Sequence, residues 1–317
     1  MNVTRRQLLK NAAIGGIVSS FLPLIPTHAE SKKTSVNRAL RIAHITDVHI
    51  LDQKNAEASF ARVMNDINSL KDKPDLIINT GDTVMDENQQ TKETVATRWN
   101  TWQKIIQPNK IKIYSALGNH DVWYGPDATL DSEYKKEKRY GKQWAMEMLS
   151  MPDRFYSFEA KGWQFIALDS INGTGSYQLD DAQFEWLQGQ LQSIPANKPV
   201  CVFNHVPIIS VGALMYLTQR APALDTKFPS GDMHLDHQRI KNLFFKHKNV
   251  KLCLSGHVHY LDAIEYLGVK YLCNGAVSGN WWRDSFVLDE FPPVYSLIDL
   301  YEDGTSKLET VYYKFEV

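Results

Sequence analysis

The chain has 317 residues, of which 43% are hydrophobic and 22% are charged, and its formal net charge at pH 7 is -1. These proportions are typical of a soluble globular protein that is long enough to bury a substantial core. The near-neutral charge argues against a nucleic acid or another polyanion as partner, because such partners require a concentration of positive charge.

Residues 1–29 have the features of an export signal that is removed from the mature protein. Arg5 and Arg6 form a basic start, residues 12–25 are apolar, and Ala29 supplies a small residue for cleavage. The apolar stretch is shorter than the ~20 residues that span a bilayer, so we expect no stable membrane anchor. A chance basic N-terminus or an uncleaved anchor is the alternative.

The run over residues 4–10, Thr-Arg-Arg-Gln-Leu-Leu-Lys, resembles a twin-arginine signal. This resemblance implies the twin-arginine export machinery as a partner and a periplasmic or secreted location. Because the leader carries three cations and no acids, its removal takes the net charge from -1 to -4. We expect the remainder, residues 30–317, to form a single domain, since it shows no internal repeat and no second linker.

The first half of this domain alternates between short apolar runs and stretches with helical spacing. Such strand–helix–strand alternation favours parallel pairing with helices outside the sheet. The expected strands cover residues 40–46, 76–78 and 111–117, and the expected helices cover residues 60–70 and 94–106.

The second half begins with one helix in a polar excursion and continues with strands. We expect an antiparallel pair around Lys161-Gly162, and Asp180 should cap the following helix. Residues 207–229 are either a cap over the site or an ordinary packed loop. The remaining expected strands cover residues 199–203, 250–254, 269–273, 294–298 and 307–313, and a further helix covers residues 240–247.

Three cysteines, Cys201, Cys253 and Cys273, lie in apolar, strand-like runs. We expect buried thiols, with a bridge between Cys201 and Cys253 as the alternative. Their spacing does not fit a zinc cluster.

Polar side chains with the chemistry of metal ligands follow five of the expected strands. The carboxyl ends of strands in an α/β sheet are where sites are built. Residues two apart in an extended segment point the same way, so Asp47 with His49, and His257 with His259, can each aim at one point. The full set is Asp47, His49, Asp82, Asn119, His120, His205, His257 and His259.

Carboxylates, imidazoles and an amide oxygen, without a thiolate, suit ions such as Mn, Fe or Zn. The ligands are too many for one four-coordinate ion, whereas two ions about 3.5–4 Å apart, bridged by a carboxylate, would use them all. Taken singly, each of these residues has an ordinary explanation at a turn or a strand end. Together they predict a pair of transition metal ions as cofactors.

The motifs D-x-H, G-D, G-N-H-[DE], H and G-H-x-H occur complete and in order between Asp47 and His259. In this the chain resembles the calcineurin-type metallophosphoesterases. The resemblance implies an α/β fold of two packed mixed β-sheets flanked by helices. It also implies a general acid, His120, paired with Asp121, and attack on the phosphoester by a metal-bridging hydroxide. By similarity, Asp47, His49, Asp82 and His259 would hold one metal, and Asp82, Asn119, His205 and His257 the other.

Departures from the family pattern narrow the expected substrate. Protein phosphatases of this superfamily have arginines after the second motif and before the third, but residues 82–87 contain none and Leu117 precedes Gly118. Met85 stands where purple acid phosphatases place an iron-binding tyrosine. The chain therefore resembles the phosphodiesterase branch that acts on small molecules such as cyclic nucleotides and glycerophosphodiesters. A phosphomonoesterase, or a non-catalytic scaffold of the same fold, is the alternative; the complete ligand set argues against the scaffold.

Substrate-side features are weaker. Trp281, Trp282 and Arg283 have the chemistry to stack on a base or sugar and to steady a phosphate, although packing of the tryptophans onto the core explains them equally well. Five other polar residues fill no family position, and we expect structural roles for them: His44, His234, His237, His247 and Asp169.

Overall fold

The computed structural model describes residues 36–126, 133–172, 177–220, 231–283 and 292–315. The expected export signal lies outside these residues. Within them, no helix combines the length and the apolar character that crossing a membrane requires.

Five strands form the first sheet, in the order β11-β10-β1-β2-β3. β1, β2 and β3 pair in parallel, which confirms the alternation expected from the sequence. β10 returns antiparallel to β1, and β11 is antiparallel to β10, so the sheet is mixed. The strands are β1 (Arg38–Ile45), β2 (Leu76–Asn79), β3 (Lys112–Ser115), β10 (Val294–Tyr301) and β11 (Ser306–Tyr312).

Six strands form the second sheet, in the order β4-β5-β6-β7-β9-β8. β4 and β5 are the expected antiparallel pair, and both residues of their turn, Lys161 and Gly162, have positive φ (44° and 85°), as a tight hairpin requires. The edge strand β8 was not expected. The strands are β4 (Tyr156–Ala160), β5 (Trp163–Ala167), β6 (Val200–Phe203), β7 (Val250–Ser255), β8 (Asp262–Tyr266) and β9 (Val269–Cys273).

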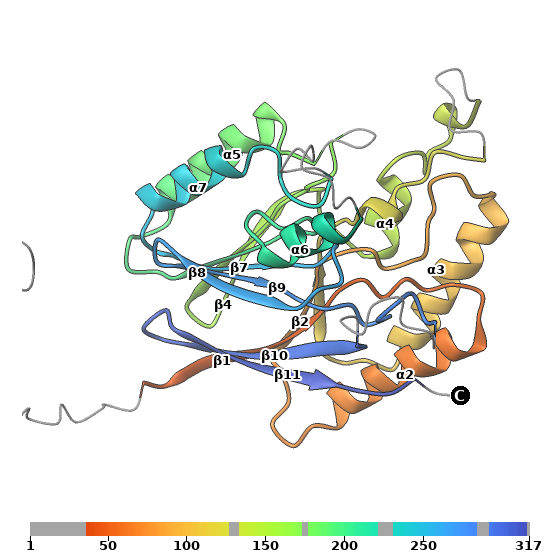
Figure 1. Ribbon diagram of the computed structural model, residues 1–317, viewed down its shortest axis with the longest axis horizontal. Helices are drawn as coiled ribbons and strands as arrows, with labels where there is room; N and C mark the ends of the chain where they lie inside the picture. Colours follow the sequence, from red (N-terminus) through yellow and green to blue (C-terminus); the bar gives the residue numbers. More distant parts are fainter. Residues whose placement is uncertain (1–35, 127–132, 173–176, 221–230, 284–291, 316–317) are drawn as a thin grey trace, which may run out of the picture. The chain divides into compact units, whose positions relative to one another are not determined.

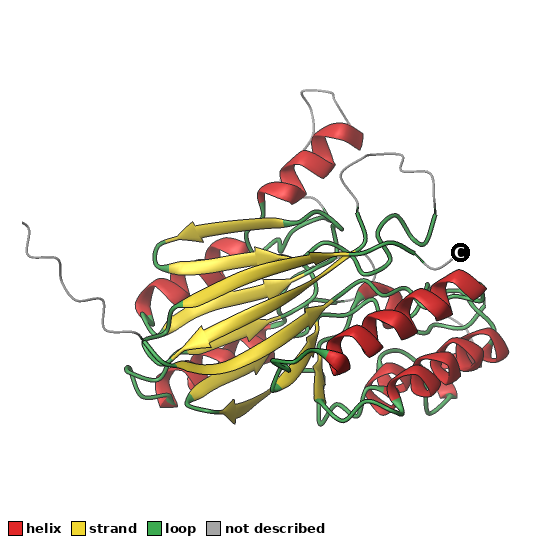
Figure 2. Cartoon of the chain, turned by 90° about the horizontal axis from the view of Figure 1, so that it is seen from below, coloured by secondary structure: helices red, strands yellow, loops and turns green. Residues whose placement is uncertain are grey.

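Helices flank the sheets, as expected for this fold class. α5 and α7 lie on the side of the second sheet that faces away from β10 and β11, whereas α2 and α3 pack beside the first sheet (Figures 1 and 2). Asp180 caps α5 as expected, since its side chain accepts a hydrogen bond from the main-chain N–H of Gln183. The helices are α2 (Lys54–Ser69), α3 (Lys92–Ile106), α4 (Gln143–Met148), α5 (Asp181–Ser193), α6 (Val211–Arg220) and α7 (His237–Lys246), with short 3-10 turns at Asn119–Asp121 and Glu133–Lys136.

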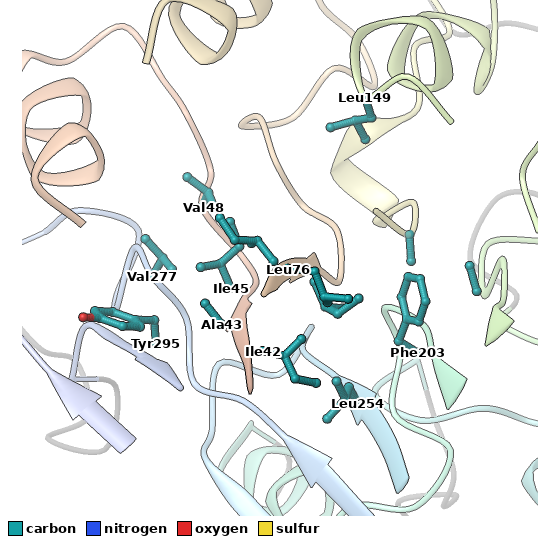
Figure 3. Close-up of a cluster of buried hydrophobic side chains, with 14 of the residues drawn as sticks. Ile42, Ala43, Ile45, Val48, Leu76, Leu149, Phe203, Leu254, Val277 and Tyr295 are labelled. Carbon is teal, nitrogen blue, oxygen red and sulfur yellow. The ribbon is translucent and has the colours of Figure 1, made fainter. Parts of the chain in front are cut away.

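The main hydrophobic core lies between the two sheets. Ile42 of β1 faces Leu254 of β7 and Phe203 of β6, and all three side chains are fully buried (Figure 3). Burying such residues stabilises the fold by about 1.5–3 kcal/mol each. A second cluster fills the space between the outer face of the second sheet and α5 and α7. The first cluster holds the two sheets together and so fixes where the ends of their strands lie, whereas the second attaches the helices to the second sheet.

The three cysteines are free and buried, as the sequence predicted. Cys201 belongs to the core between the sheets, whereas Cys253 belongs to the cluster under the helices, so the two thiols lie on opposite faces of one sheet. A bridge between them, the alternative, is not formed. Burial raises the pKa of Cys201, which keeps the thiol protonated.

Candidate metal centre

The polar side chains singled out in the sequence come together where strands of both sheets end. The side chains form three groups, and within each group the ligand atoms all lie within 4.8 Å of one another. Asp82 and His49 each belong to two of these groups, so the groups form one continuous cluster. They are Asp47 with His49 and His259, His49 with Asp82 and His120, and Asp82 with His205 and His257.

Facing nitrogens in this cluster fit a cation. His259 Nδ1 donates to a main-chain oxygen at 2.7 Å, which leaves a lone pair on Nε2, 3.1 Å from His49 Nε2. In the same way His205 Nδ1 lies 2.8 Å from the carbonyl oxygen of Thr80, and its Nε2 lies 3.2 Å from His257 Nδ1. His257 Nε2 also lies 2.8 Å from a main-chain oxygen, so the facing nitrogens of His205 and His257 both carry lone pairs, which repel unless a proton or a cation lies between them. The residues present therefore fit metal ions.

The carboxylate of Asp82 occupies the place expected of a shared ligand. Its Oδ2 lies 3.7 Å from His49 Nε2 and 3.2 Å from His205 Nε2. Asn119 joins from the same side, with its Oδ1 3.1 Å from His205 Nε2. Burial alone would raise the pKa of Asp82, but the nearby imidazoles of His205 and His120 hold that pKa well below its usual range. Asp82 is therefore ionised between both halves of the cluster.

The histidines differ in how readily they shed a proton to bind a metal. Burial lowers the pKa of His49 well below its usual value and that of His257 to about 4, so both are neutral, as ligation requires. Burial also acts to lower the pKa of His205, but the carboxylate of Asp82 outweighs it and raises this pKa to about 9. At His205, a proton and a metal ion compete for the same nitrogen.

Five of the seven expected ligands have a left-handed backbone, with φ of 51° at Asp47, 47° at His49, 50° at Asp82, 76° at His257 and 61° at His259. This conformation costs a residue with a Cβ atom about 1–2 kcal/mol. The expectation that an extended backbone makes the paired ligands converge is therefore wrong. They converge because tight turns aim them, and such strain clusters at functional sites.

Glycines beside the ligands leave room for these turns. A Cβ atom at Gly118 would lie 2.1 Å from the main-chain nitrogen of Asp82, and one at Gly256 would lie 2.0 Å from Thr46 Oγ1. Neither position accepts a side chain without moving a ligand. Thr46 itself donates to Asp47 Oδ2 at 2.6 Å and so orients that carboxylate, a role the sequence analysis missed.

His120 lies at the rim of the cluster, with its side chain 25% exposed and its Nε2 3.9 Å from Asp82 Oδ2. Its expected pairing with Asp121 is wrong. The carboxylate of Asp121 is buried and accepts hydrogen bonds from the main-chain N–H groups of Thr83 (2.8 Å) and Gly118 (3.0 Å). Asp121 thus holds together the two loops that carry Asp82 and His120.

Asp86 is the carboxylate that faces His120. Its Oδ1 lies 3.7 Å from His120 Nδ1, at ion-pair distance, and it also accepts a hydrogen bond from Asn88 Nδ2 at 3.2 Å. Asp86 has a φ of 43°, so its backbone is turned in the same strained way as the ligands. This role of Asp86 was not expected, although a carboxylate four positions after Asp82 was the available signal.

Comparison with known proteins agrees with this geometry. Residues 40–261 match the calcineurin-like phosphoesterase family. The chain belongs to this family. It is 25% identical over 290 residues to a 3',5'-cyclic-nucleotide phosphodiesterase of Nostoc sp., covering 88% of this chain and 95% of the relative. It is also 25% identical over 243 residues to a probable glycerophosphodiester phosphodiesterase GpdQ of Arcobacter nitrofigilis, covering 76% and 71%.

Among solved structures, a dimetal phosphatase from Danio rerio superimposes with a TM-score of 0.58 at 13% sequence identity, covering 88% of this chain and all of that one. This likeness confirms the fold of two mixed sheets with flanking helices. The family match and the two phosphodiesterase relatives make the protein a metal-dependent phosphoester hydrolase.

The loop after β9, beyond the matched region, brings one tryptophan to the centre and buries the other. The Trp281 ring centroid lies 4.3 Å from that of His259 and 6.1 Å from that of His49. Trp282 is 2% exposed, and its Nε1 donates to the main-chain oxygens of Val48 and His49 at 3.0 Å each. The expected substrate role of Trp282 is therefore wrong, because its indole is buried and anchors the turn that carries Asp47 and His49. Arg283 is exposed.

The polar residues that filled no family position have structural partners. His44 Nε2 lies 2.9 Å from the hydroxyl of Thr80, and His237 Nδ1 lies 3.1 Å from a main-chain oxygen. Asp169 accepts from Lys142 at 2.5 Å and from Arg154. His247 ends α7. Of the expected cap, residues 221–230 lie outside the described part, and α6 occupies residues before them.

Proposed function

We propose that the protein hydrolyses small phosphodiesters, with cyclic nucleotides as the first class to test and glycerophosphodiesters as the second. The observation that carries the proposal is the cluster of candidate metal ligands, whose loops within the described residues have no arginine to clamp the extra charge of a phosphomonoester. Arg98 reaches the loop after Asp82, but its guanidinium donates to the main-chain oxygens of Met85 and Asp86. The Nostoc relative is named as a phosphodiesterase and the Arcobacter relative as a probable one, which supports the same choice.

The residues of the site then have separable roles. Two bound divalent ions would supply a hydroxide nucleophile at neutral pH and neutralise charge on the phosphoryl oxygens. Asp47, His49, Asp82 and His259 would hold one ion, and Asn119, His205 and His257 would join Asp82 in holding the other. His120 would protonate the leaving oxygen, since its imidazole is partly exposed at the rim of the cluster and it is not among the ligands assigned above.

On the substrate side, Trp281 is the residue we assign to recognition. Its ring lies against that of His259, beside the proposed metal position, where a nucleobase or sugar attached to the scissile phosphate would reach it. The strained backbone at Trp281 (φ 50°) and the anchored Trp282 that follows fix where the ring lies.

A substrate panel on protein of measured metal content tests the proposal. We expect faster turnover of bis(p-nitrophenyl) phosphate than of p-nitrophenyl phosphate, and release of nucleoside monophosphate from 3',5'-cyclic AMP or cyclic GMP. Preference for the monoester at every metal loading would identify a phosphomonoesterase. Two bound metals with no turnover of any phosphoester would identify a non-catalytic scaffold.

We further propose that the protein is exported through the twin-arginine route to the periplasm or beyond. The basis is the sequence of residues 4–10 and the small Ala29 at the end of the leader. Replacing both Arg5 and Arg6 with lysine should retain the protein in the cytoplasm. An unchanged yield outside the cytoplasm would reject this route.

A further inference from the structure

Three side chains outside the metal centre form a chain of hydrogen bonds. His234 Nε2 lies 2.9 Å from Ser170 Oγ, and His234 Nδ1 lies 3.0 Å from Asp236 Oδ1. Ser170 and His234 are completely buried. A serine, a histidine and an aspartate in this order are the parts of a nucleophilic triad, but a nucleophile has to meet its substrate. The burial of Ser170 therefore indicates a positioning role.

The hydroxyl of Ser170 determines where the protons lie. Its oxygen faces the main-chain N–H of Val206 at 3.3 Å and the side-chain NH2 of Asn204 at 3.4 Å. Because these two donors use both lone pairs, the O–H of Ser170 has to donate to His234 Nε2. The ring then carries its hydrogen on Nδ1 and donates it to Asp236. Each bond in the chain thus has one direction, which gives it a single preferred geometry.

The carboxylate of Asp236 fixes the far end of this chain. Its Oδ2 accepts hydrogen bonds from Arg239 Nη2 at 3.1 Å and from the main-chain N–H of Leu179 at 3.2 Å. Burial alone would raise the pKa of Asp236, yet the bonds from His234 and Arg239 hold it below its usual range. The carboxylate therefore stays ionised and connects α7 to the segment that precedes α5.

The other end of the chain reaches the ligands. Asn204 and Val206, which meet the Ser170 hydroxyl, are the residues on either side of His205. The segment that carries His234 also presents the main-chain oxygen of Gly231, which lies 2.8 Å from His257 Nε2. That contact leaves His257 Nδ1 to face His205. His205 and His257 thus both depend on main-chain segments that the hydrogen bonds of Ser170, His234 and Asp236 hold in place.

We propose that Ser170, His234 and Asp236 are positioning residues for the metal-binding group made of Asp82, His205 and His257. The inference rests on the proposed function only through its metal centre. Replacing a hydrogen-bond partner that orients a ligand typically weakens metal binding by about 10–100-fold. The group of Asp47, His49 and His259 is held from elsewhere, since Trp282 anchors the turn of His49. Loss of these hydrogen bonds should therefore weaken one metal-binding step and leave the other unchanged.

The test is titration of the metal-free full-length protein with Co2+, followed by calorimetry and by visible absorption, which reports coordination. Ser170→Ala should weaken one of the two binding steps about tenfold or more and leave the other unchanged. Asn249→Ala is the matched control. This buried side chain, which directly precedes β7, also donates hydrogen bonds to the main chain, to the oxygens of Pro195 (3.3 Å) and Lys198 (3.1 Å). It should lower stability and leave both steps unchanged.

Wild-type Co2+ binding by Ser170→Ala, or equal weakening of both steps, would overturn the proposal. If Ser170→Ala does not fold, Asp236→Asn keeps the side-chain shape, and the same comparison decides. Wild-type protein that binds two Co2+ ions but hydrolyses no phosphoester would overturn the proposed function and leave this inference standing.

Discussion

Replacing His120 with alanine separates proton donation from metal binding. The change removes only the ring, because the two contacts that hold this position are made by its main chain: His120 N–H donates to Asp82 Oδ1 at 2.8 Å, and its carbonyl oxygen accepts from Glu87 N–H at 2.9 Å. The lost ring packs edge to face on His49, with centroids 4.9 Å apart, a contact worth about 0.5–1.5 kcal/mol. We therefore expect a folded protein with Asp82 in place.

The expected loss is in the rate. Positioned acid catalysis contributes about 10²–10⁴-fold, which corresponds to ~2.7–5.4 kcal/mol in the activation barrier at 1.36 kcal/mol for each tenfold. The turnover of a diester with an alkoxide leaving group should fall by this range. With a p-nitrophenolate leaving group, which needs little protonation, the fall should be much smaller.

The assay compares kcat for both leaving groups on wild type and His120→Ala, with metal content measured by elemental analysis. His49→Ala is the control, because it should lose metal as well as activity. The geometry also allows His120 to be a ligand, since one of its ring nitrogens lies within 4.8 Å of a ring nitrogen of His49 and of a carboxylate oxygen of Asp82. Loss of a metal ion from His120→Ala, or an equal fall for both leaving groups, would refute its assignment as the acid.

Three further substitutions test other parts of the site. Asp82→Asn keeps the shape but removes a charge shared by both metal groups, so elemental analysis should show the loss of at least one ion; two ions with ordinary turnover would contradict a bridging role. Asp86→Asn should lower kcat without changing metal content, because its carboxylate faces His120 and none of the proposed ligands; an unchanged kcat would exclude a role in orienting His120. Trp282→Phe leaves two buried carbonyls without a donor and should lower the unfolding free energy by about 1–3 kcal/mol in urea titrations. A midpoint equal to wild type would contradict the anchoring role.

Most strands could be predicted because their apolar runs are buried on both faces. Residues 76–78 and 250–254 are of this kind, and they became β2 and β7. β8 was missed because its residues are intermediate or exposed, which gives no apolar run to recognise. α6 was left within a stretch with two interpretations, since Val211 and Met215 are exposed and its apolar residues do not mark a buried face.

The site was predictable in its members but not in its internal contacts. Ligand type and order follow from short motifs, so the cluster of Asp82, His205 and His257 could be named from the sequence. Which carboxylate faces His120 depends on how two loops turn, and neighbours in sequence are a poor guide there. Asp121 follows His120 directly, but its carboxylate points to the main chain of the other loop.

The turned backbone of the ligands shows why the surrounding loops matter as much as the ligands. Five left-handed residues at about 1–2 kcal/mol each amount to a large part of the 5–15 kcal/mol by which a domain is usually stable. Main-chain bonds hold the turns: Asp47 N–H donates to Gly81 O at 3.0 Å, His49 N–H to Asp82 O at 2.9 Å, and Ser278 N–H to Asp47 O at 3.1 Å. The turn that carries Asp47 and His49 is therefore fixed both by the turn that carries Asp82 and by the loop after β9. Because strain of this size persists only where several elements oppose its release, a loosened loop after β9 should disturb the ligand turn before it disturbs the core.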